Sequence, residues 1–351
     1  MVVRVPYGED VDVAVVSWNS WPRLRDSLPA LIDQDYPAYR VVVVDNASSD
    51  ATAESVEAQF PDVTVIRADR NGGYGAGNNL CISRSRSAYV AVLNPDATPE
   101  RGWLRALVRA LEAHPDAALA TSKVLLASDR RRVNACGNNV HLSGIAWCRG
   151  LGEDQQDFAA GEPVAAVSGA AFLARRDVLD EIGGFDERFF MYMEDTELSL
   201  RARLAGYDVV LAPRSRVAHD YEFAIPAWKF YLLERNRAFM LLNIFRWRTL
   251  LLLAPLLAVT EAGVWWWALR TGRATFRAKA ASYAAVAREL REALRIRRRV
   301  QAMRRVGDAA LLAHMETALP RSVAGASAKS MQMADVVFAW YAKALRRVVR
   351  W

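Results

Sequence analysis

Length, composition and charge limit the kinds of protein that this chain can be. It has 351 residues, of which 52% are hydrophobic, so it exceeds one average domain and can bury a large core. The formal net charge is +7, but residues 270–305 hold twelve Arg or Lys against two Glu, so the basicity belongs largely to one late segment. Cys81, Cys136 and Cys148 form no CxxC pair, which argues against a disulfide framework or a zinc site. Acidic residues within residues 1–12 argue against a signal peptide, so we expect a reducing, cytosolic setting.

Strands and helices are predicted to alternate along the first third of the chain. Apolar runs predict strands at residues 11–19, 41–44, 63–66 and 88–93, and the segments between and after them predict helices at 22–32, 51–59, 77–86 and 100–114. This alternation is typical of βαβ units, so we expect an α/β fold with a mostly parallel sheet flanked by helices.

The middle of the chain is less regular. Residues 121–164 carry Gly, Asn and charged clusters that indicate loops with short strands, and order is expected to return at 164–174. A helix over 196–205 is followed by Gly206, which can stop it, and then by a short strand at 208–212. A further helical run covers residues 228–242.

The composition changes after about residue 239. Residues 249–260 carry no charge, and Trp265, Trp266 and Trp267 follow soon after Glu261. Residues 249–269 meet the length of a membrane-spanning helix only if Glu261 is tolerated, and a re-entrant or interfacial helical hairpin is an equal alternative. Aromatic residues beside a basic stretch suit an anionic lipid surface, and this arrangement argues against nucleic acid as the partner.

We therefore expect three regions, a catalytic domain at residues 1–238, a helical membrane-associating region at 239–306 and a helical tail at 307–351. The tail could instead be a dimerisation element, with Trp340, Leu345 and Trp351 in a helical interface of a homodimer.

Two of the predicted strands run directly into an acid. Asp45 follows an apolar strand, and Asp96 closes the sequence Asn94-Pro95-Asp96 after another. Ligands of open α/β sheets collect outside the carboxyl ends of the strands, so both acids are expected at one crevice. Asp45 could accept the imide N–H of a uracil or thymine ring, and Asp96 could bind a divalent cation that bridges a diphosphate. A helix cap at Asp45 and an ordinary turn at Asp96 are the structural alternatives.

Four glycines fall within six positions of residues 72–77. Such a stretch could approach the sugar or phosphate of a nucleotide closely, although it matches neither a Walker loop nor a dinucleotide fingerprint. A flexible connector is the alternative. The candidate contacts in this stretch are Asn71, Gly72, Gly73, Gly77 and Asn78.

A third acidic site, Glu194-Asp195, opens a predicted helix. Negative charge is favourable at a helix start, which is one explanation, but an ionised carboxylate lining a cleft could also act as a general base. His219 is a candidate partner of a metal or phosphate, and Arg235 could contact a phosphate. A structural histidine and a solvated helix face explain the same residues.

Taken in order, these motifs resemble those of family 2 glycosyltransferases with the GT-A fold, over roughly residues 11–242. The nearest subgroup is the rhamnosyltransferase-like enzymes that build bacterial cell-envelope and O-antigen glycans. The motifs are the first strand with Ser17, Trp18 and Asn19, the strand end with Asp45 and Asn46, the stretch 71–79, Asn94-Pro95-Asp96, and Glu194-Asp195 with Leu198, Arg201, Gly206 and Tyr207. Any one of them is weak, but five in the same order and spacing are specific.

The resemblance implies a Rossmann-like GT-A sheet, a nucleotide-diphosphate sugar as donor and Mg²⁺ or Mn²⁺ as cofactor. It places Asp45 at the nucleotide base, Asn94 and Asp96 at the family's Asp-x-Asp position, and Asp195 as catalytic base beside Glu194. His219 matches a position that helps to bind metal or diphosphate. The residues expected at the nucleotide sugar are Ser17, Asn19, Asp45, Asn46, Asn71, Gly72, Gly73, Gly77, Asn78, Asn94, Asp96 and Arg235.

Two departures from the family pattern refine this expectation. Asn94 replaces the first acid of Asp-x-Asp, which puts a strict metal requirement in doubt. The Gln-x-x-Arg-Trp signature of processive synthases is missing at Arg246-Trp247, which favours transfer of a single sugar. We expect an inverting hexosyltransferase that uses a dTDP- or UDP-sugar, with rhamnose as one candidate, and acts on a lipid-linked or polysaccharide acceptor at the cytoplasmic face of a bacterial plasma membrane. A polyprenyl-phosphate sugar synthase and a catalytically silent sugar-nucleotide-binding scaffold are the alternatives.

Overall fold

The computed structural model of the chain describes residues 8–220, 223–320 and 328–351, which form two compact units. The first unit takes in the chain up to residue 138 together with residues 148–202 and 207–222, and the second takes in residues 139–147, 203–206 and 223–351. Residues 1–7, on which the expectation about a signal peptide partly rests, lie outside the described residues. The boundaries expected after residues 238 and 306 stay predictions.

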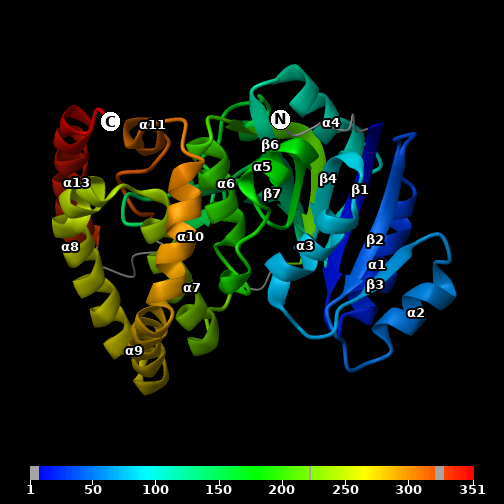
Figure 1. The fold of residues 1–351 in the computed structure, drawn as a ribbon, viewed down its shortest axis with the longest axis horizontal. Coiled ribbons are helices and arrows are strands. Elements are labelled where there is room, and N and C mark those ends of the chain that lie inside the picture. The colour runs from blue at the N-terminus through cyan, green and yellow to red at the C-terminus, as the bar shows by residue number, and fades with distance from the viewer. Residues whose placement is uncertain (1–7, 221–222, 321–327) are drawn as a thin grey trace. The chain divides into compact units, whose positions relative to one another are not determined.

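A nine-stranded mixed sheet forms the centre of the first unit (Figure 1). The strand order is β3-β2-β1-β4-β10-β6-β11-β5, and β7 pairs with β6. β1 is parallel to β2 and β4, and β2 to β3, as the alternation of strands and helices predicts; β10 is antiparallel to both β4 and β6. The strands are β1 (Gly8–Ser17), β2 (Tyr39–Asp45), β3 (Thr64–Arg67), β4 (Ser87–Leu93), β5 (Ala97–Pro99), β6 (Ala117–Leu126), β7 (Asp129–Ala135), β10 (Ala171–Arg175) and β11 (Asp208–His219).

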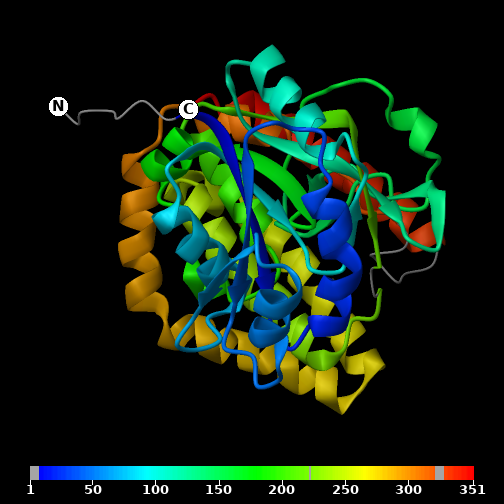
Figure 2. The same ribbon diagram turned by 90° about the vertical axis from the view of Figure 1, so that its right-hand side faces the viewer.

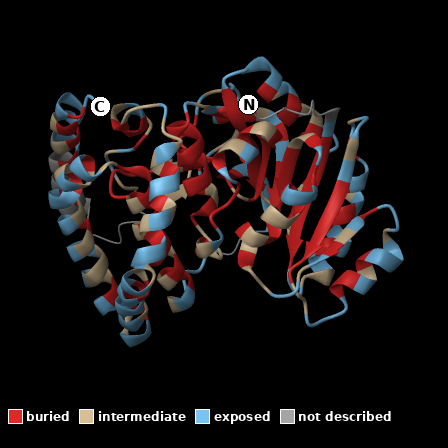
Figure 3. Ribbon diagram, viewed as in Figure 1, coloured by how far each residue is buried: buried red, intermediate tan, exposed pale blue. Residues whose placement is uncertain are grey.

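The parallel strands of this sheet are buried on both faces. Val42 and Val43 point to opposite sides of β2, and both are buried, as are Val90 and Ala91 of β4. Figure 3 accordingly shows these strands mainly in the colour of buried residues. Burial on both faces explains why the sequence there is a continuous apolar run rather than an alternating one.

Helices cover this sheet and connect its parallel strands. α3 packs against β1 and β2, and α4 packs against β6 and β11. The helices of this part of the chain are α1 (Trp21–Ile32), α2 (Thr52–Gln59), α3 (Gly73–Arg84), α4 (Trp103–Ala113), α5 (Arg176–Ile182) and α6 (Glu194–Leu204), with short 3-10 turns at Gln155–Phe158 and Glu187–Phe189. The order expected at residues 164–174 is limited to β10, from Ala171 onward.

The middle of the chain contains more strand than expected. The segment expected to hold loops with short strands includes the second half of β6, which is ten residues long, and β7. The short strand expected at 208–212 continues to His219, because β11 pairs with β6 over nearly its whole length. This pairing is between segments distant in sequence, so local patterns could not reveal it.

The second unit is helical apart from one small sheet, at least in the part of it that the structure describes. Its helices are α7 (Ala227–Ile244), α8 (Trp247–Thr271), α9 (Arg273–Arg288), α10 (Leu290–Ala302), α11 (Asp308–Ala313) and α13 (Ala328–Val348); β8 (Asn138–Val140) and β9 (Ala146–Cys148) pair with each other. α9 packs against α7 and α8, and the chain turns a corner between α9 and α10 (Figure 2). Residues 249–269 lie within the single helix α8, which continues through Pro255.

Candidate active site

The parallel strands β1 and β2 end side by side at one edge of the sheet. Ser17 is the register partner of Asp45, and each is the last residue of its strand. Oδ2 of Asp45 accepts a hydrogen bond from the Ser48 backbone N–H at 3.3 Å. Oδ1 of Asp45 and Oγ of Ser17 are buried and have no hydrogen-bond partner among the described residues. Buried polar atoms are almost always paired, so this strand edge is ready to receive a ligand with a hydrogen-bond donor.

Asn19 and Asn46 hold the loops around this edge. The Asn19 side-chain oxygen accepts from the Ser49 backbone N–H at 2.8 Å. The Asn46 amide donates to Asn71 Oδ1 and to the Gly73 carbonyl, both at 3.0 Å. These two asparagines therefore shape the backbone of the site, and direct contact between either side chain and a nucleotide stays a prediction.

The glycine-rich stretch belongs to a helix from Gly73 onward, so the alternative of a flexible connector is wrong beyond Gly72. Helix α3 begins at Gly73, not near Gly77 as expected, and ends at Arg84. A Cβ on Gly77 would lie 2.5 Å from a methyl group of Val16, and Gly73 has φ +84° with its Cβ position 2.1 Å from the Phe190 carbonyl oxygen. Close packing within the protein thus requires these two glycines. Contact of this stretch, including Gly72 and Asn78, with a nucleotide sugar stays a prediction.

Three polar side chains converge where β4 and β11 end: Asn94 and Asp96 follow β4, and His219 is the last residue of β11. His219 Nε2 lies 3.2 Å from Asp96 Oδ1 and 3.4 Å from Asn94 Nδ2, and its other ring nitrogen lies 3.0 Å from Asn134 Oδ1. Arg23 of α1 donates to the second oxygen of Asp96 at 2.6 Å. Burial opposes ionisation of Asp96, but the hydrogen bond and charge of His219 and the charge of Arg23 outweigh it, so the pKa of Asp96 lies below its usual value.

Glu194 and Asp195 are adjacent acids with different surroundings. Asp195 Oδ2 accepts from the Gly169 N–H at 2.7 Å and from Asn138 Nδ2 at 3.0 Å, and Oδ1 accepts from the N–H and hydroxyl of Thr196 at 2.6 and 3.1 Å. Burial raises the pKa of Asp195, and these hydrogen bonds counteract the rise. Glu194 Oε2 is buried without a hydrogen-bond partner among the described residues, and burial together with the Asp195 charge raises the pKa of Glu194 to about 8.

The backbone leading into this acid pair is strained. Phe190, Tyr192 and Met193 have φ values of 60°, 68° and 69°, which side chains with a Cβ rarely adopt. Strain of this kind persists only where the surrounding contacts impose it, and it concentrates at functional sites. Here one contact is visible, because the Phe190 carbonyl accepts from the Tyr74 N–H at 2.6 Å.

Tyr74 joins the acidic segments. Its hydroxyl donates to the Gly169 carbonyl at 2.5 Å, and Gly169 in turn donates to Asp195. Burial and then the negative charges of Glu194, Asp195 and Asp96 raise the pKa of Tyr74 well above its usual value. The residue after Gly169, Ala170, accepts from the Asn94 N–H at 2.9 Å, so the structure brings the segments 94–96 and 194–195 together.

Several residues at this site were not found by sequence reasoning. Arg23, Tyr74 and Asn138 contact the predicted acids or adjoin them. Arg23 and Asn138 belong to no motif, and Tyr74 lies in the glycine-rich stretch but was not among its candidate contacts. Tyr74 could have been noticed as the one aromatic residue among the clustered glycines. Arg23 and Asn138 carry no comparable signal, because their partners are 73 and 57 residues away.

Arg235 lies on α7, in the second unit. Its Nε donates to Asn236 Oδ1 at 3.0 Å, and its guanidinium lies over the Tyr231 ring at 5.6 Å from the ring centre. Its contact with a donor phosphate stays a prediction.

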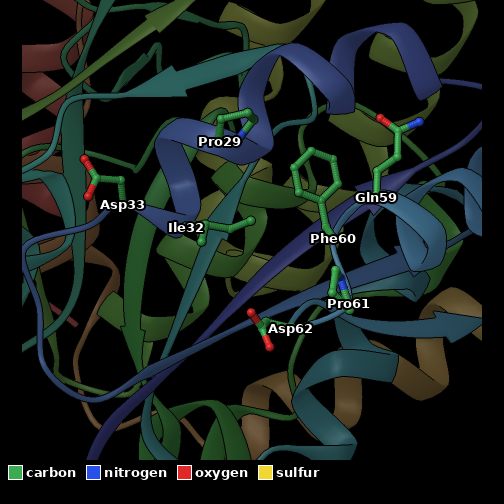
Figure 4. A pocket seen from close by; sticks show the side chains of 7 residues that line it. All are labelled: Pro29, Ile32, Asp33, Gln59, Phe60, Pro61 and Asp62. Carbon is green, nitrogen blue, oxygen red and sulfur yellow. The ribbon is translucent and has the colours of Figure 1, made fainter.

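A separate hollow of about 400 Å³ lies on the first unit (Figure 4). None of the predicted site residues lines it. Its lining residues come from the ends of α1 and α2 and from the residues directly after them: Pro29, Ile32, Asp33, Gln59, Phe60, Pro61 and Asp62.

With this geometry in place, comparison with known proteins gives the family. Residues 12–183, which contain Asp45 and Asp96, match the family described as glycosyl transferase family 2. The chain belongs to this family. It is therefore a glycosyltransferase, as the resemblance implied, and the expected rhamnosyltransferase-like character is confirmed by a relative described below.

Two relatives come from Mycobacterium tuberculosis. N-acetylglucosaminyl-diphospho-decaprenol L-rhamnosyltransferase is 29% identical over 229 residues, which cover 59% of this chain and 75% of the relative. Pre-mycofactocin glycosyltransferase is 27% identical over 224 residues, which cover 64% of this chain and 45% of the relative. The crystal structure of GalNAc-T7 with UDP, GalNAc and Mn²⁺ has a TM-score of 0.55 at 16% identity and covers 67% of this chain and 48% of its own. This likeness shows the fold, and the expected GT-A class is confirmed.

Proposed function

We propose that this glycosyltransferase moves one sugar from a nucleotide-diphosphate donor to a hydroxyl of a lipid-linked acceptor, with inversion at the anomeric carbon. The observation that carries the proposal is the pair of hydrogen bonds at residues 169–170, where the Gly169 N–H donates to Asp195 at 2.7 Å and the Ala170 carbonyl accepts from the Asn94 N–H at 2.9 Å, so that the two acidic segments lie side by side. Such an arrangement can place a leaving diphosphate and an attacking hydroxyl near the same carbon.

The edge formed by Ser17 and Asp45 is the proposed site of the nucleotide base. The open Oδ1 of Asp45 can accept the imide N–H of uracil or thymine, and the open Oγ of Ser17 can donate to a neighbouring carbonyl. UDP and dTDP donors would both satisfy these atoms.

Asp96 and His219 are the residues that would hold a divalent cation. A carboxylate oxygen and an imidazole nitrogen 3.2 Å apart form a donor set that Mn²⁺ or Mg²⁺ can share with diphosphate oxygens. No cluster of three or more His, Cys, Asp or Glu side chains suited to a metal occurs in the described part of the chain. The diphosphate oxygens of the nucleotide sugar would therefore have to complete the coordination of the cation. When bound, the cation would neutralise charge on the leaving diphosphate.

Asp195 is the proposed base that takes the proton of the acceptor hydroxyl. Its oxygens already accept four hydrogen bonds, of which the one from the Thr196 hydroxyl can be given up by rotation of that hydroxyl. Glu194, with its pKa raised to about 8, holds a proton at neutral pH and leaves the pair with a single negative charge. The backbone amide of Gly169 and the amide of Asn138 then fix the orientation of the Asp195 carboxylate.

The proposed acceptor is a polyprenyl-diphosphate glycan, as in the name of the rhamnosyltransferase relative. A lipid-linked acceptor requires the enzyme to meet a membrane. Among the described residues, one helix, Trp247–Thr271, is long and apolar enough to cross a membrane, and only 22% of its most apolar stretch is buried. This helix, α8, is compatible with membrane association.

The exposed face of α8 is the surface that we assign to the lipid. Every exposed residue between Leu251 and Leu269 is apolar, whereas five of the seven exposed residues of α10 are charged. The apolar stripe is bounded by Arg248 at one end and Arg270 at the other, which suits an interfacial helix between anionic headgroups. The stripe consists of Leu251, Ala254, Pro255, Ala258, Val259, Ala262, Gly263, Trp266 and Leu269.

Vesicle binding by the full chain tests the lipid surface. Leu269→Glu places a charge on the exposed stripe and is expected to weaken binding to phosphatidylglycerol vesicles in a sedimentation assay by about thirtyfold or more, because burying an unpaired charge in lipid costs about 2–3 kcal/mol. The matched control is Leu290→Glu, an exposed leucine on the charged face of α10. Equal loss in both variants, or no loss in Leu269→Glu, would contradict the assignment.

A transfer assay tests the proposed function itself. The purified protein is incubated with UDP- or dTDP-sugars, Mg²⁺ or Mn²⁺, and a polyprenyl-diphosphate N-acetylglucosamine, and the product is identified by mass spectrometry and by the anomeric coupling in its NMR spectrum. A product one sugar longer with inverted configuration supports the proposal. Transfer only to polyprenyl phosphate would indicate a sugar synthase instead, and nucleotide binding without hydrolysis or transfer would indicate a silent scaffold.

A further inference from the structure

Arg23 lies on the face of α1 that contacts the Asn94-Pro95-Asp96 turn. It is the third residue of the helix, which begins soon after the end of β1 and therefore at the same edge of the sheet. One turn further along, the Ser27 hydroxyl donates to the Pro95 carbonyl at 2.9 Å. Residues four apart share a helix face, so Ser27 fixes the position from which Arg23 reaches the turn.

The Arg23 guanidinium covers one oxygen of Asp96. Its Nη1 donates to Asp96 Oδ2 at 2.6 Å, while Asp96 Oδ1 faces His219 at 3.2 Å. Both oxygens of this carboxylate thus have a partner before any nucleotide sugar binds. The Arg23 side chain is 56% exposed, whereas the Asp96 side chain is 16% exposed. The guanidinium is thus already largely in water, so its movement away from Asp96 costs little.

The small number of acids at this turn gives Arg23 a large influence on binding of the nucleotide sugar. Position 94 holds an asparagine, so Asp96 is the single acid of the turn. A divalent cation that coordinates Asp96 must share its oxygens with Arg23 or displace it. A displaced guanidinium remains on α1 beside the turn, where its fork of N–H donors matches the oxygens of a diphosphate.

We propose that Arg23 covers Asp96 in the donor-free protein and moves to the donor diphosphate when a divalent cation takes its place on that carboxylate. The inference rests on the proposed function, since it assigns Arg23 a role toward the same donor. Arg23 is then both a competitor of the cation and a second source of positive charge for the leaving group.

Binding of Mn²⁺ alone tests the first half of this proposal. Free Mn²⁺ is measured by electron paramagnetic resonance in titrations of the full chain without nucleotide. Arg23→Ala is expected to bind Mn²⁺ about two- to fivefold more tightly than the wild type, the range that corresponds to loss of a partly exposed ion pair. Arg25→Ala is the matched control, because Arg25 lies on the same helix, is 58% exposed and pairs only with Asp26 in the described residues.

Binding of UDP and dTDP at saturating Mn²⁺ tests the second half. Arg23→Ala is expected to weaken nucleotide binding about tenfold, through loss of a charge-assisted hydrogen bond to phosphate, and Arg23→Lys is expected to restore part of it. A merely structural role would shift both affinities in the same direction or leave both unchanged. Opposite shifts in Arg23→Ala with none in Arg25→Ala support the proposal.

Two results would overturn it: equal Mn²⁺ affinity in the wild type and Arg23→Ala, or unchanged nucleotide affinity in Arg23→Ala. If the wild type binds neither UDP nor dTDP, the proposed donor is wrong and the movement of Arg23 to a diphosphate falls with it. The titration with Mn²⁺ alone still decides, in that case, whether Arg23 covers Asp96.

Discussion

Each unit of this protein holds a pair of carboxyl groups of which one is buried and one partly buried, and the two pairs are built in opposite ways. In the second unit, Glu234 and Glu261 share the cations Arg237 and Lys279, and Arg237 lies 2.7 Å from Glu234 while Lys279 lies 2.7 Å from Glu261. Lys279 also pairs with Glu234, Arg237 pairs with Glu261, and the Tyr283 hydroxyl donates to Glu261. In the first unit, Glu194 and Asp195 have no cationic partner among the described residues.

The surroundings move the acidities of these pairs in opposite directions. Burial would raise the pKa of Glu261, but Arg237, Lys279 and Tyr283 lower it to about 2, and Arg237 and Lys279 likewise outweigh burial to lower the pKa of Glu234. Burial and mutual repulsion raise the pKa of Glu194 to about 8. A balanced cluster is typical of structural ion pairs, whereas an uncompensated pair with an open oxygen is typical of a site that handles protons.

The largest effect is expected from a substitution in the acid pair of the first unit. Asp195→Asn removes the proposed base while keeping the shape of the side chain, so turnover should fall about a thousandfold, within the range for loss of a general base. Donor affinity, measured by calorimetry with UDP or dTDP, should stay within about twofold of the wild type. Turnover near the wild-type value would exclude Asp195 as the base.

The next largest effect is expected from a substitution in the charge-balanced cluster of the second unit, which contains Glu234, Glu261, Arg237 and Lys279. Lys279→Met leaves Glu234 and Glu261 short of one cation, so the free energy of unfolding should drop by about 3 kcal/mol at pH 7. Denaturant unfolding followed by tryptophan fluorescence measures the loss. Arg295→Met, which removes an exposed pair with Glu292 on α10, is the control and should change this free energy by less than about 0.5 kcal/mol.

Acid should reduce the difference between wild type and Lys279→Met. Carboxyl groups with lowered pKa values stabilise the folded state above their unfolded value near 4.5, and this stability is lost as pH falls toward about 2. The difference between the two proteins should therefore narrow below about pH 4.5 and vanish only near pH 2. A constant difference from pH 7 to pH 3 would show that packing of the lysine, not its charge, stabilises the unit.

The smallest effect distinguishes Glu194 from Asp195. Glutamine resembles protonated glutamate, so Glu194→Gln should lose less than about tenfold in turnover at pH 7, where a carboxyl with a pKa of about 8 is mostly protonated. If Glu194→Gln loses as much turnover as Asp195→Asn, the roles of the two acids must be exchanged or shared.

Stability supplies an independent test of the raised pKa. Because the folded value of about 8 lies above the unfolded value of 4.5, the Glu194 carboxyl increasingly destabilises the fold as pH rises between these values. Glu194→Gln should therefore melt about 3 °C or more above the wild type at pH 8.5 and at nearly the same temperature at pH 5. An equal difference at both pH values would contradict the shift.

Local patterns predicted much of the first unit. The continuous apolar runs at β2 and β4 are buried on both faces, and Asp45 and Asp96 follow directly, so the strand ends could be located from the sequence. The glycines at 73 and 77 were recognised as special, but the close packing that requires them was not foreseen. A glycine required by a ligand and one required by a neighbouring helix or strand are identical in a sequence, and only the distances to Val16 and Phe190 separate them.

By itself the sequence determined the alternation of strands and helices, the family, and the acids that end the strands, because these depend on residue type and spacing over short stretches. The tertiary structure alone decided which polar atoms are satisfied. It pairs Asp96 with Arg23 and His219, surrounds Asp195 with donors from Asn138 and Gly169, and leaves Glu194 Oε2 and Asp45 Oδ1 open. Hydrogen bonds and charge act between atoms brought together by folding, so the acidity of each carboxyl depends on partners that lie up to 123 residues away in the chain.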